Sequence, residues 1–255
     1  MITLLSPAKT LDFDSTLPDW QATEPEFVNE SHQLIKKLRS LSKKKVSQLM
    51  NLSNDLTELN AMRYQEWEPE FNPTESKPAV MAFSGEVYRG LDAASFSHED
   101  HEFAQEHLRI LSGLHGLLRP LDRIRPYRLE MGTSLSIRKN KNLYQFWSDK
   151  ITDALNEAMN NSQTNFILNL ASIEYSKAVD FSKINGQVIT PVFKDFKSGE
   201  YKVIMTWAKQ ARGSMANYVI KNKIMDPQKI KLFDKYQYMD SMSKDNEWVF
   251  VREGE

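Results

Sequence analysis

The chain of 255 residues contains no cysteine. This absence excludes disulfide bonds, thiolate zinc sites, cysteine-ligated iron–sulfur clusters and a cysteine nucleophile. The short apolar start ends at once in Ser6 and Pro7 and carries no basic residue, so no export signal is expected. No apolar run approaches the roughly 20 residues that span a bilayer. We therefore expect a soluble, cytoplasmic protein without a membrane contact.

A large excess of either charge is also missing, but the charges are unevenly distributed. The 33 basic and 34 acidic residues give a net charge of −1. Residues 109–141 nevertheless hold eight bases against two acids, and residues 194–231 hold nine bases against three acids. Such stretches can form a positive surface that attracts phosphate. A third basic run, residues 36–45, is typical of a solvated helix face.

The pattern of apolar residues favours an α+β fold. Short apolar runs, two pairs of which flank polar turns as hairpins do, predict strands at 2–5, 79–83, 166–170, 188–193, 201–206, 236–239 and 248–251. Capping residues followed by helical spacing predict helices after Thr23, Ser42, Ser53, Ser97 (reaching residue 111) and Ser148, and one over 207–223 that Gly213 interrupts. We expect one domain over residues 1–255, a mixed sheet surrounded by helices.

Lys9 is the first candidate for chemistry, in the segment 6–12 that follows the first predicted strand. Functional side chains often lie just past a strand end. A lysine there can bind phosphate, or act as a nucleophile if burial lowers its pKa. The segment lacks the glycines of a Walker loop. An ordinary surface lysine is the alternative interpretation.

Residues 108–120 predict a glycine turn between two apolar segments. Gly113 and Gly116 enclose Leu114 and His115, and Arg119 follows. The pattern is similar to the helix–hairpin–helix motif of DNA-binding proteins, in which a glycine turn brings backbone amides close to a phosphate. The usual hairpin is one residue shorter, and a helix C-cap followed by a turn is the structural alternative. These five residues are candidate DNA contacts.

Arginines and an aromatic residue follow in an extended, proline-interrupted stretch. Arg125 and Arg128 flank Tyr127, whose ring offers a stacking surface for a base, while the guanidinium forks suit phosphates. Glu130 is either a structural partner of these arginines or a general acid/base.

A second basic pair lies on the last long predicted helix. Lys209 and Arg212 are three residues apart and share one helix face, next to a glycine that permits close approach. They are further candidate phosphate contacts, and a solvated helix face is the alternative.

A metal site is a weaker interpretation of the sequence. His98, His101 and Glu102 share a helix face at spacings of three and four, but the pattern matches no established motif. A solvated first helical turn explains it better. We expect neither a bound metal nor a cofactor.

Taken together, these segments resemble the YaaA peroxide-stress family. The matching motifs are SPAKTLD at 6–12, SGEVYRGL at 84–91, LSGLHGLLRPLD at 111–122, PYRLEMGT at 126–133, NLASIEY at 169–175 and ARGSMA at 211–216. They occur in order along nearly the whole chain, which makes the resemblance specific.

The resemblance implies a cytoplasmic bacterial protein that helps cells survive hydrogen peroxide and limits iron-linked oxidative damage to DNA and proteins. It also implies an unusual single-domain fold in which a helix–hairpin–helix element lies beside a positive, DNA-binding cleft. By motif match, residues 113–116 form the hairpin, and the cleft is lined by Lys9, Arg119, Arg125, Arg128 and Arg212.

Two classes of function remain open from the sequence. The leading one is a monomeric stress protein that binds duplex or damaged DNA. The alternative is an enzyme that acts on a damaged nucleobase or nucleotide, with Lys9 and Glu130 as candidate catalytic residues. An iron-binding protein is a third, weaker possibility, since cysteine is absent and the histidines are poorly arranged.

Overall fold

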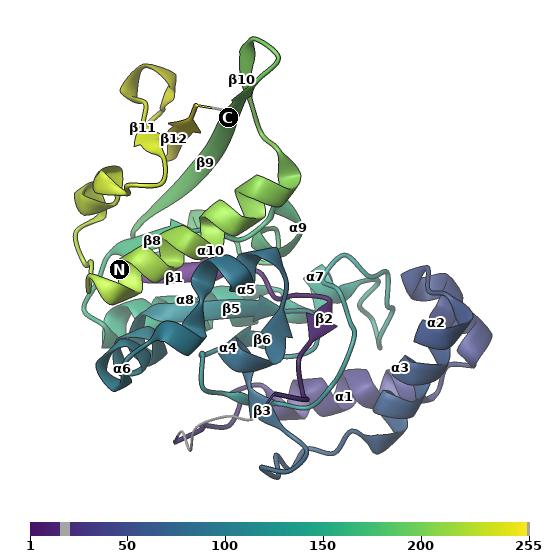
Figure 1. Ribbon diagram of the computed structural model, residues 1–255. Helices are drawn as coiled ribbons and strands as arrows, with labels where there is room; N and C mark the ends of the chain where they lie inside the picture. The colour runs from purple at the N-terminus through teal and green to yellow at the C-terminus, as the bar shows by residue number, and fades with distance from the viewer. Residues whose placement is uncertain (16–20, 254–255) are drawn as a thin grey trace.

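A mixed sheet of eight strands runs through the computed structural model, which describes residues 1–15 and 21–253 (Figure 1). Its strand order is β11-β12-β9-β8-β1-β5-β6, and β10 pairs with β9 outside this path. The strands are β1 Ile2–Leu5, β5 Leu108–Ser112, β6 Gly116–Leu118, β8 Phe166–Asn169, β9 Gln187–Lys197, β10 Glu200–Lys202, β11 Gln237–Tyr238 and β12 Glu247–Arg252. Two small sheets pair β2 Thr10–Leu11 with β4 Phe83–Ser84, and β3 Lys77–Pro78 with β7 Arg123–Ile124. The expected α+β fold with a mixed sheet is confirmed.

The central strand β1 is parallel to both of its neighbours, β5 and β8. All four of its residues are buried, as expected for an apolar strand covered on both faces. Because parallel strands end at the same edge of a sheet, the segments that follow β1 and β8 meet there. This carboxyl edge carries the candidate site.

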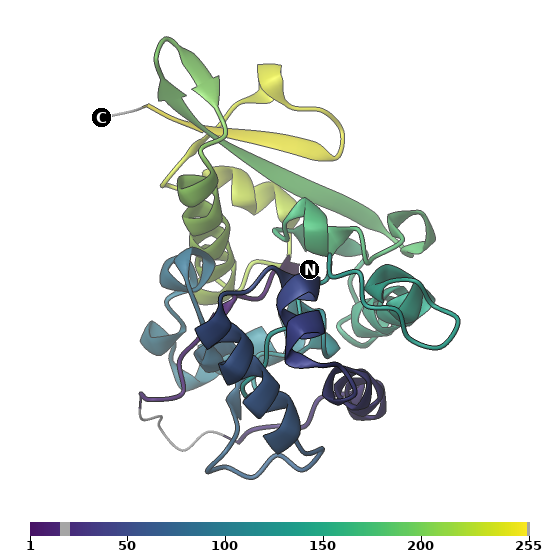
Figure 2. The same ribbon diagram turned by 90° about the vertical axis from the view of Figure 1, so that its right-hand side faces the viewer.

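Helices cover both faces of the sheet. They are α1 Val28–Arg39, α2 Lys43–Met50, α3 Asn54–Glu66, α4 Ala79–Ala82, α5 Glu86–Leu91, α6 His98–His107, α7 Leu143–Trp147, α8 Asp149–Asn161, α9 Ile173–Ser176 and α10 Met205–Lys221. Short 3₁₀ turns lie at Ala93–Ser95, Phe181–Lys183, Pro227–Leu232 and Asp240–Met242. The long helix α10 lies with α5 and α6 on one face of the sheet, and α8 lies on the other (Figures 1 and 2). Within the described residues, no helix has both the length and the apolar character needed to cross a bilayer.

Serine caps start several helices where the sequence predicts them. The side chains of Ser42 and Ser53 accept from the backbone N–H groups that begin α2 and α3, and Ser97 forms a full capping box with Asp100. The cap predicted at Thr23 is wrong, because α1 begins at Val28. Thr23 instead donates its hydroxyl hydrogen to Asp122 Oδ1 at 2.6 Å, which ties the segment before α1 to the loop between β6 and β7.

Four predicted elements differ from the structure, because tertiary contacts override local pattern. The strand predicted at 201–206 ends early, since β10 ends at Lys202 and α10 begins at Met205. The run 79–83 is helix α4 followed by the first residue of β4. The helix after Ser97 ends at His107, because residues 108–112 pair alongside β1 as strand β5. Gly213 does not interrupt α10, which is continuous.

Gly213 serves a close approach between helices instead. A Cβ atom at Gly213 would lie 1.8 Å from the carbonyl oxygen of Val87, and one at Gly90 would lie 2.2 Å from the carbonyl oxygen of Gln210. Only glycine allows the backbones of α5 and α10 to meet at these distances. The contact fixes the position of α10 relative to the carboxyl edge.

The far edge of the sheet is held by a buried carboxylate. Asp195 on β9 is fully buried, and it accepts from Arg252 Nε on β12 at 2.7 Å and from the Tyr236 hydroxyl at 3.1 Å. The strands β9 to β12 project away from the helix pair α2 and α3, which lies at the opposite end of the molecule (Figure 1).

Candidate functional site

A cavity of about 280 Å³ opens at the carboxyl ends of β1 and β8. We call it the cationic cavity, because Lys9, Lys209 and Arg212 line it. The other lining residues are Ser6, Pro7, Ala8, Thr10, Ser84, Gly85, Glu86, Val87, Leu170, Ser172, Glu174 and Tyr175. They come from the four segments after β1, around the start of α5, after β8 and within α10. The fold therefore brings together side chains that lie up to more than 200 residues apart in the sequence.

The two cations on α10 have nothing to neutralise them. Over residues 1–15 and 21–253, no hydrogen bond or ion pair engages the side chain of Lys209 or Arg212. Arg212 is only partly exposed, and burial lowers the pKa of its guanidinium from the ordinary value. Arginine stays charged in proteins, so its desolvation is a cost that a bound anion would relieve.

The two carboxylates that line the cationic cavity are both engaged. Glu86 forms an ion pair with Arg89 one turn further along α5. Glu174 Oε1 accepts from the backbone N–H of Gly132 at 3.0 Å. Within the described chain neither carboxylate pairs with Lys209 or Arg212, so these two cations keep unneutralised positive charges beside the cavity.

Hydroxyl groups join the ends of β1 and β8. Ser6 Oγ accepts from the backbone N–H of Ser172 at 2.8 Å, and the two serine hydroxyls lie 3.2 Å apart. Tyr88 on α5 donates its hydroxyl hydrogen to the Ser6 carbonyl at 3.1 Å. These hydrogen bonds connect three of the four lining segments, namely those after β1, after β8 and at α5.

Lys9 connects the cationic cavity to the arginine stretch. Its Nζ lies 3.2 Å from Glu130 Oε2, while Arg128 reaches Glu130 Oε1 with an N–O distance of 2.9 Å. The side chain of Lys9 is 61% exposed, whereas those of Glu130 and Arg128 are 19% and 17% exposed. Two cations thus share one largely buried carboxylate, and of the three side chains only that of Lys9 is mostly exposed.

The interpretation of residues 108–118 as a helix–hairpin–helix is wrong. They form the antiparallel strands β5 and β6, in which Ile110 pairs with Leu118 and Ser112 pairs with Gly116. Leu114 and His115 in the turn are completely buried. The apolar residues that suggested two helices instead fill the core around the central strand.

The turn between β5 and β6 uses its own polar groups internally. The backbone N–H of His115 donates to Ser112 Oγ at 2.9 Å, and the Gly113 carbonyl accepts from Trp147 Nε1 at 3.0 Å. A Cβ atom at Gly116, which has a φ of +67°, would lie 2.6 Å from the Trp147 ring. Both predicted hairpin glycines therefore serve packing, and their backbone does not face solvent.

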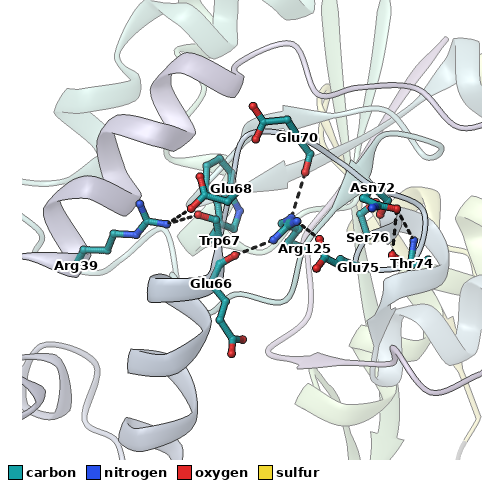
Figure 3. Close-up of polar contacts among 10 residues, drawn as sticks. All are labelled: Arg39, Glu66, Trp67, Glu68, Glu70, Asn72, Thr74, Glu75, Ser76 and Arg125. Atoms are coloured by element: carbon teal, nitrogen blue, oxygen red, sulfur yellow. Dashed lines mark hydrogen bonds and ion pairs between the residues drawn. The ribbon is translucent and has the colours of Figure 1, made fainter.

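Arg119 and Arg125 lie away from the cationic cavity. Arg119 pairs with the buried Asp122 at 3.0 Å. Arg125 donates to the carbonyls of Glu66 at 2.7 Å and Glu70 at 3.2 Å and pairs with Glu75, so it fastens the loop 66–76 (Figure 3). The same figure shows Arg39 holding the start of this loop through Trp67 and Glu68.

Tyr127, expected as an exposed stacking ring, is also part of the core. It is 5% exposed, and its hydroxyl lies 2.7 Å from Ser112 Oγ. His98 and Glu102 form a surface pair at 3.3 Å, whereas His101 is 2% exposed and packs on Phe96. The histidines of α6 therefore face different environments.

A helix–turn–helix segment does exist elsewhere in the described chain. Helices α2 and α3 are joined by residues 51–53, with Asn51 in the left-handed region at a φ of 49° and Leu52 buried. Lys44 and Lys45 on α2 are exposed. The sequence predicted both serine caps of this pair but assigned its basic run to a solvated surface only.

Sequence reasoning named the three cations as site residues, but it gave no role to the rest of the wall, which lies within the motifs 6–12, 84–91 and 169–175. Ser6, Ser84 and Ser172 each lie at or shortly after the end of a strand, and nothing in their local pattern says that these three segments meet. The available signal was topological, because polar residues that follow parallel strands gather at one sheet edge.

The chain belongs to a family of peroxide stress proteins. A family model described as peroxide stress protein YaaA matches residues 1–242, which confirms the resemblance seen in the motifs. Among its relatives are proteins described as UPF0246 proteins from Teredinibacter turnerae and Colwellia psychrerythraea. Each is 48% identical to the chain over 254 residues, which cover 99% of both sequences.

Proposed function

We propose that the protein acts in the peroxide-stress response by binding DNA, and that the cationic cavity is its phosphate contact. The proposal combines the family's association with peroxide stress and the chemistry of the cavity. Binding of this kind would place the protein on DNA, where it could limit iron-linked oxidative damage.

The observation that carries the proposal is the unpartnered pair on α10. Lys209 and Arg212 lie one helical turn apart, and within the described chain neither is neutralised by a carboxylate. Arginine forks bind phosphate oxygens in pairs, and such charge-assisted bonds are about twice as strong as neutral ones. Lys9 adds a third positive charge at the mouth.

The alternative of a Lys9-dependent enzyme receives less support from the geometry. A lysine nucleophile is activated by desolvation in an apolar pocket or by a neighbouring cation. Lys9 is 61% exposed and paired with Glu130. A binding role fits this environment better than an imine-forming role.

Salt dependence of duplex binding tests the proposal. Each neutralised phosphate contributes about −0.9 to the slope of log affinity against log salt, so three cations predict a slope between roughly −2 and −3. Arg212→Gln should weaken binding to all duplex sequences alike and make the slope shallower by about one unit. Fluorescence anisotropy with a labelled duplex at several salt concentrations measures both quantities.

Lys221→Ala is the matched control, because it removes one positive charge from the exposed far end of the same helix. It should leave affinity and slope nearly unchanged. A double variant, Lys44→Ala with Lys45→Ala, probes the helix pair α2 and α3. Binding that is lost with this double variant but kept in Arg212→Gln would move the contact to the helix pair and overturn the proposal.

A further inference from the structure

The cationic cavity is too small for duplex DNA and has the size of a site for one small ligand. Its volume of about 280 Å³ lies just below the range of roughly 300–1,000 Å³ found for small-molecule pockets. A paired base step cannot enter such a space. A single nucleotide that has left the base stack can.

The lining of the cationic cavity divides by chemistry. The unpartnered cations Lys209 and Arg212 both come from α10. The apolar contributions of Pro7, Val87 and Leu170 come from the other three segments. The same three segments also carry the hydroxyls of Ser6, Ser84 and Ser172. A ligand that is anionic at one end and has both apolar and hydrogen-bonding groups in its body matches this lining.

Glu174 supplies a hydrogen-bond acceptor on the wall that follows β8. Its Oε1 is fixed by the N–H of Gly132 at 3.0 Å, and a Cβ at Gly132 would lie only 3.2 Å from that oxygen. Across residues 1–15 and 21–253, no second group binds Oε2. A carboxylate held by one oxygen can accept from a sugar hydroxyl or a base amino group with the other.

We propose that the cationic cavity holds one nucleoside monophosphate unit, with its phosphate on Arg212 and Lys209 and its sugar or base donor on Glu174. This inference deepens the proposed function and rests on it for one source of the ligand, a nucleotide extruded from a DNA strand. The other source of the same chemistry is a free mononucleotide.

Binding of small ligands tests the inference directly. Isothermal titration should show that dGMP and dAMP bind, while the corresponding nucleosides and inorganic phosphate alone bind at least about tenfold more weakly. Arg212→Gln should weaken dGMP binding by about 10- to 100-fold, the loss expected for a hydrogen bond to a charged group. Glu174→Gln keeps an oxygen for Gly132 and removes the charged acceptor, so it should lower the preference for dGMP over inorganic phosphate by several-fold. Lys221→Ala is again the matched control, and melting curves establish that each variant is folded.

A second arm separates the two sources of the nucleotide. In competition with a labelled oligonucleotide that carries one unpaired nucleotide, dGMP should displace the probe, whereas a fully paired duplex should compete less well. If dGMP binds but no oligonucleotide does, the ligand is the free nucleotide, and the proposed DNA contact fails while this inference stands.

Two results would overturn the inference. Inorganic phosphate that binds as tightly as dGMP would show a simple anion site. Duplex binding that depends on Arg212, combined with no measurable dGMP binding, would leave the proposed function intact and refute the nucleotide site.

Discussion

Three buried histidines, His101, His107 and His115, make the protein less stable at mildly acidic pH, because burial lowers the pKa of each. Burial lowers the pKa of His115 to about 3 and that of His107 to about 4. An unfolded histidine has a pKa near 6.5, so at about pH 5 the unfolded chain binds protons that the native state excludes. The stabilising contribution is complete above roughly pH 6.5. It falls as the pH drops towards the folded values, by up to about 1.4 kcal/mol per pH unit for each histidine.

His115→Phe isolates one of these protons. The side chain lies among the rings of Trp67, Phe71 and Tyr127, so an aromatic replacement retains the packing. Urea unfolding at about pH 7 and about pH 5 gives the fall in the free energy of unfolding between these two pH values. This fall should be smaller in the variant than in the parent, because the variant lacks the proton that His115 takes up on unfolding. An equal loss in both proteins would show that His115 does not titrate on unfolding.

At the scale of residues, the sequence indicated which side chains could bind phosphate, but it did not indicate where the fold places them. Lys9, Lys209 and Arg212 were chosen because cations near strand ends and glycines suit phosphate, and they do line one cavity. Arg125 was chosen because its guanidinium suits phosphate beside the ring of Tyr127, yet it is engaged by loop carbonyls and Glu75. The difference lies in which partners the fold brings close, and residue type does not encode that.

At the scale of elements, the contact between α5 and α10 gives a sharp prediction. Gly213→Ala should destabilise the protein by about 1–3 kcal/mol, because the added methyl group would lie 1.8 Å from the Val87 carbonyl. At an unconstrained helix position, the same Gly→Ala substitution would instead stabilise the protein by about 1 kcal/mol, because alanine has the higher helix propensity. Thermal or urea unfolding measures the change. Gln210→Ala, on an exposed side chain of the same helix, should be neutral within about 0.5 kcal/mol.

The loop 66–76 supplies another prediction at this scale. Arg125→Ala removes donors from the carbonyls of Glu66 and Glu70 and the partner of Glu75, and should cost about 1–3 kcal/mol. Hydrogen exchange should accelerate in the loop more than elsewhere, while DNA affinity per folded molecule stays the same. An affinity loss as large as that of Arg212→Gln would place Arg125 in the interface after all. Lys139→Ala, at an exposed position, serves as the control.

Elements were predictable where a local signal was sufficient. The serine caps of α2, α3 and α6 and the strands β1 and β8 follow from caps and apolar runs. The hairpin of β5 and β6 was not predictable in this way, since the stretch 108–118 has the apolar content of either a helix or a buried strand. Only its place beside β1 decides the outcome.

For the whole molecule, we predict a single cooperative unfolding transition. The buried apolar residues form one cluster that includes Met1 and Ile2 at one end of the chain and Trp248 and Phe250 near the other. Urea transitions followed by tryptophan fluorescence and by far-ultraviolet circular dichroism should therefore coincide. Two separated transitions, or two stable halves after limited proteolysis, would contradict one domain.

The position of β12 in the sheet has a consequence for how the protein is made. Although β12 follows both β9 and β11 in the chain, it lies between them, and its Arg252 reaches the buried Asp195. During synthesis β11 has no neighbour in the sheet until β12 has left the ribosome. Strand β1 is made early, but its two neighbours in the sheet, β5 and β8, follow roughly 100 and 160 residues later in the chain. The apolar first strand therefore lacks its neighbours until β5 and β8 have been made, and a chaperone that shields nascent apolar segments should raise the yield of native protein.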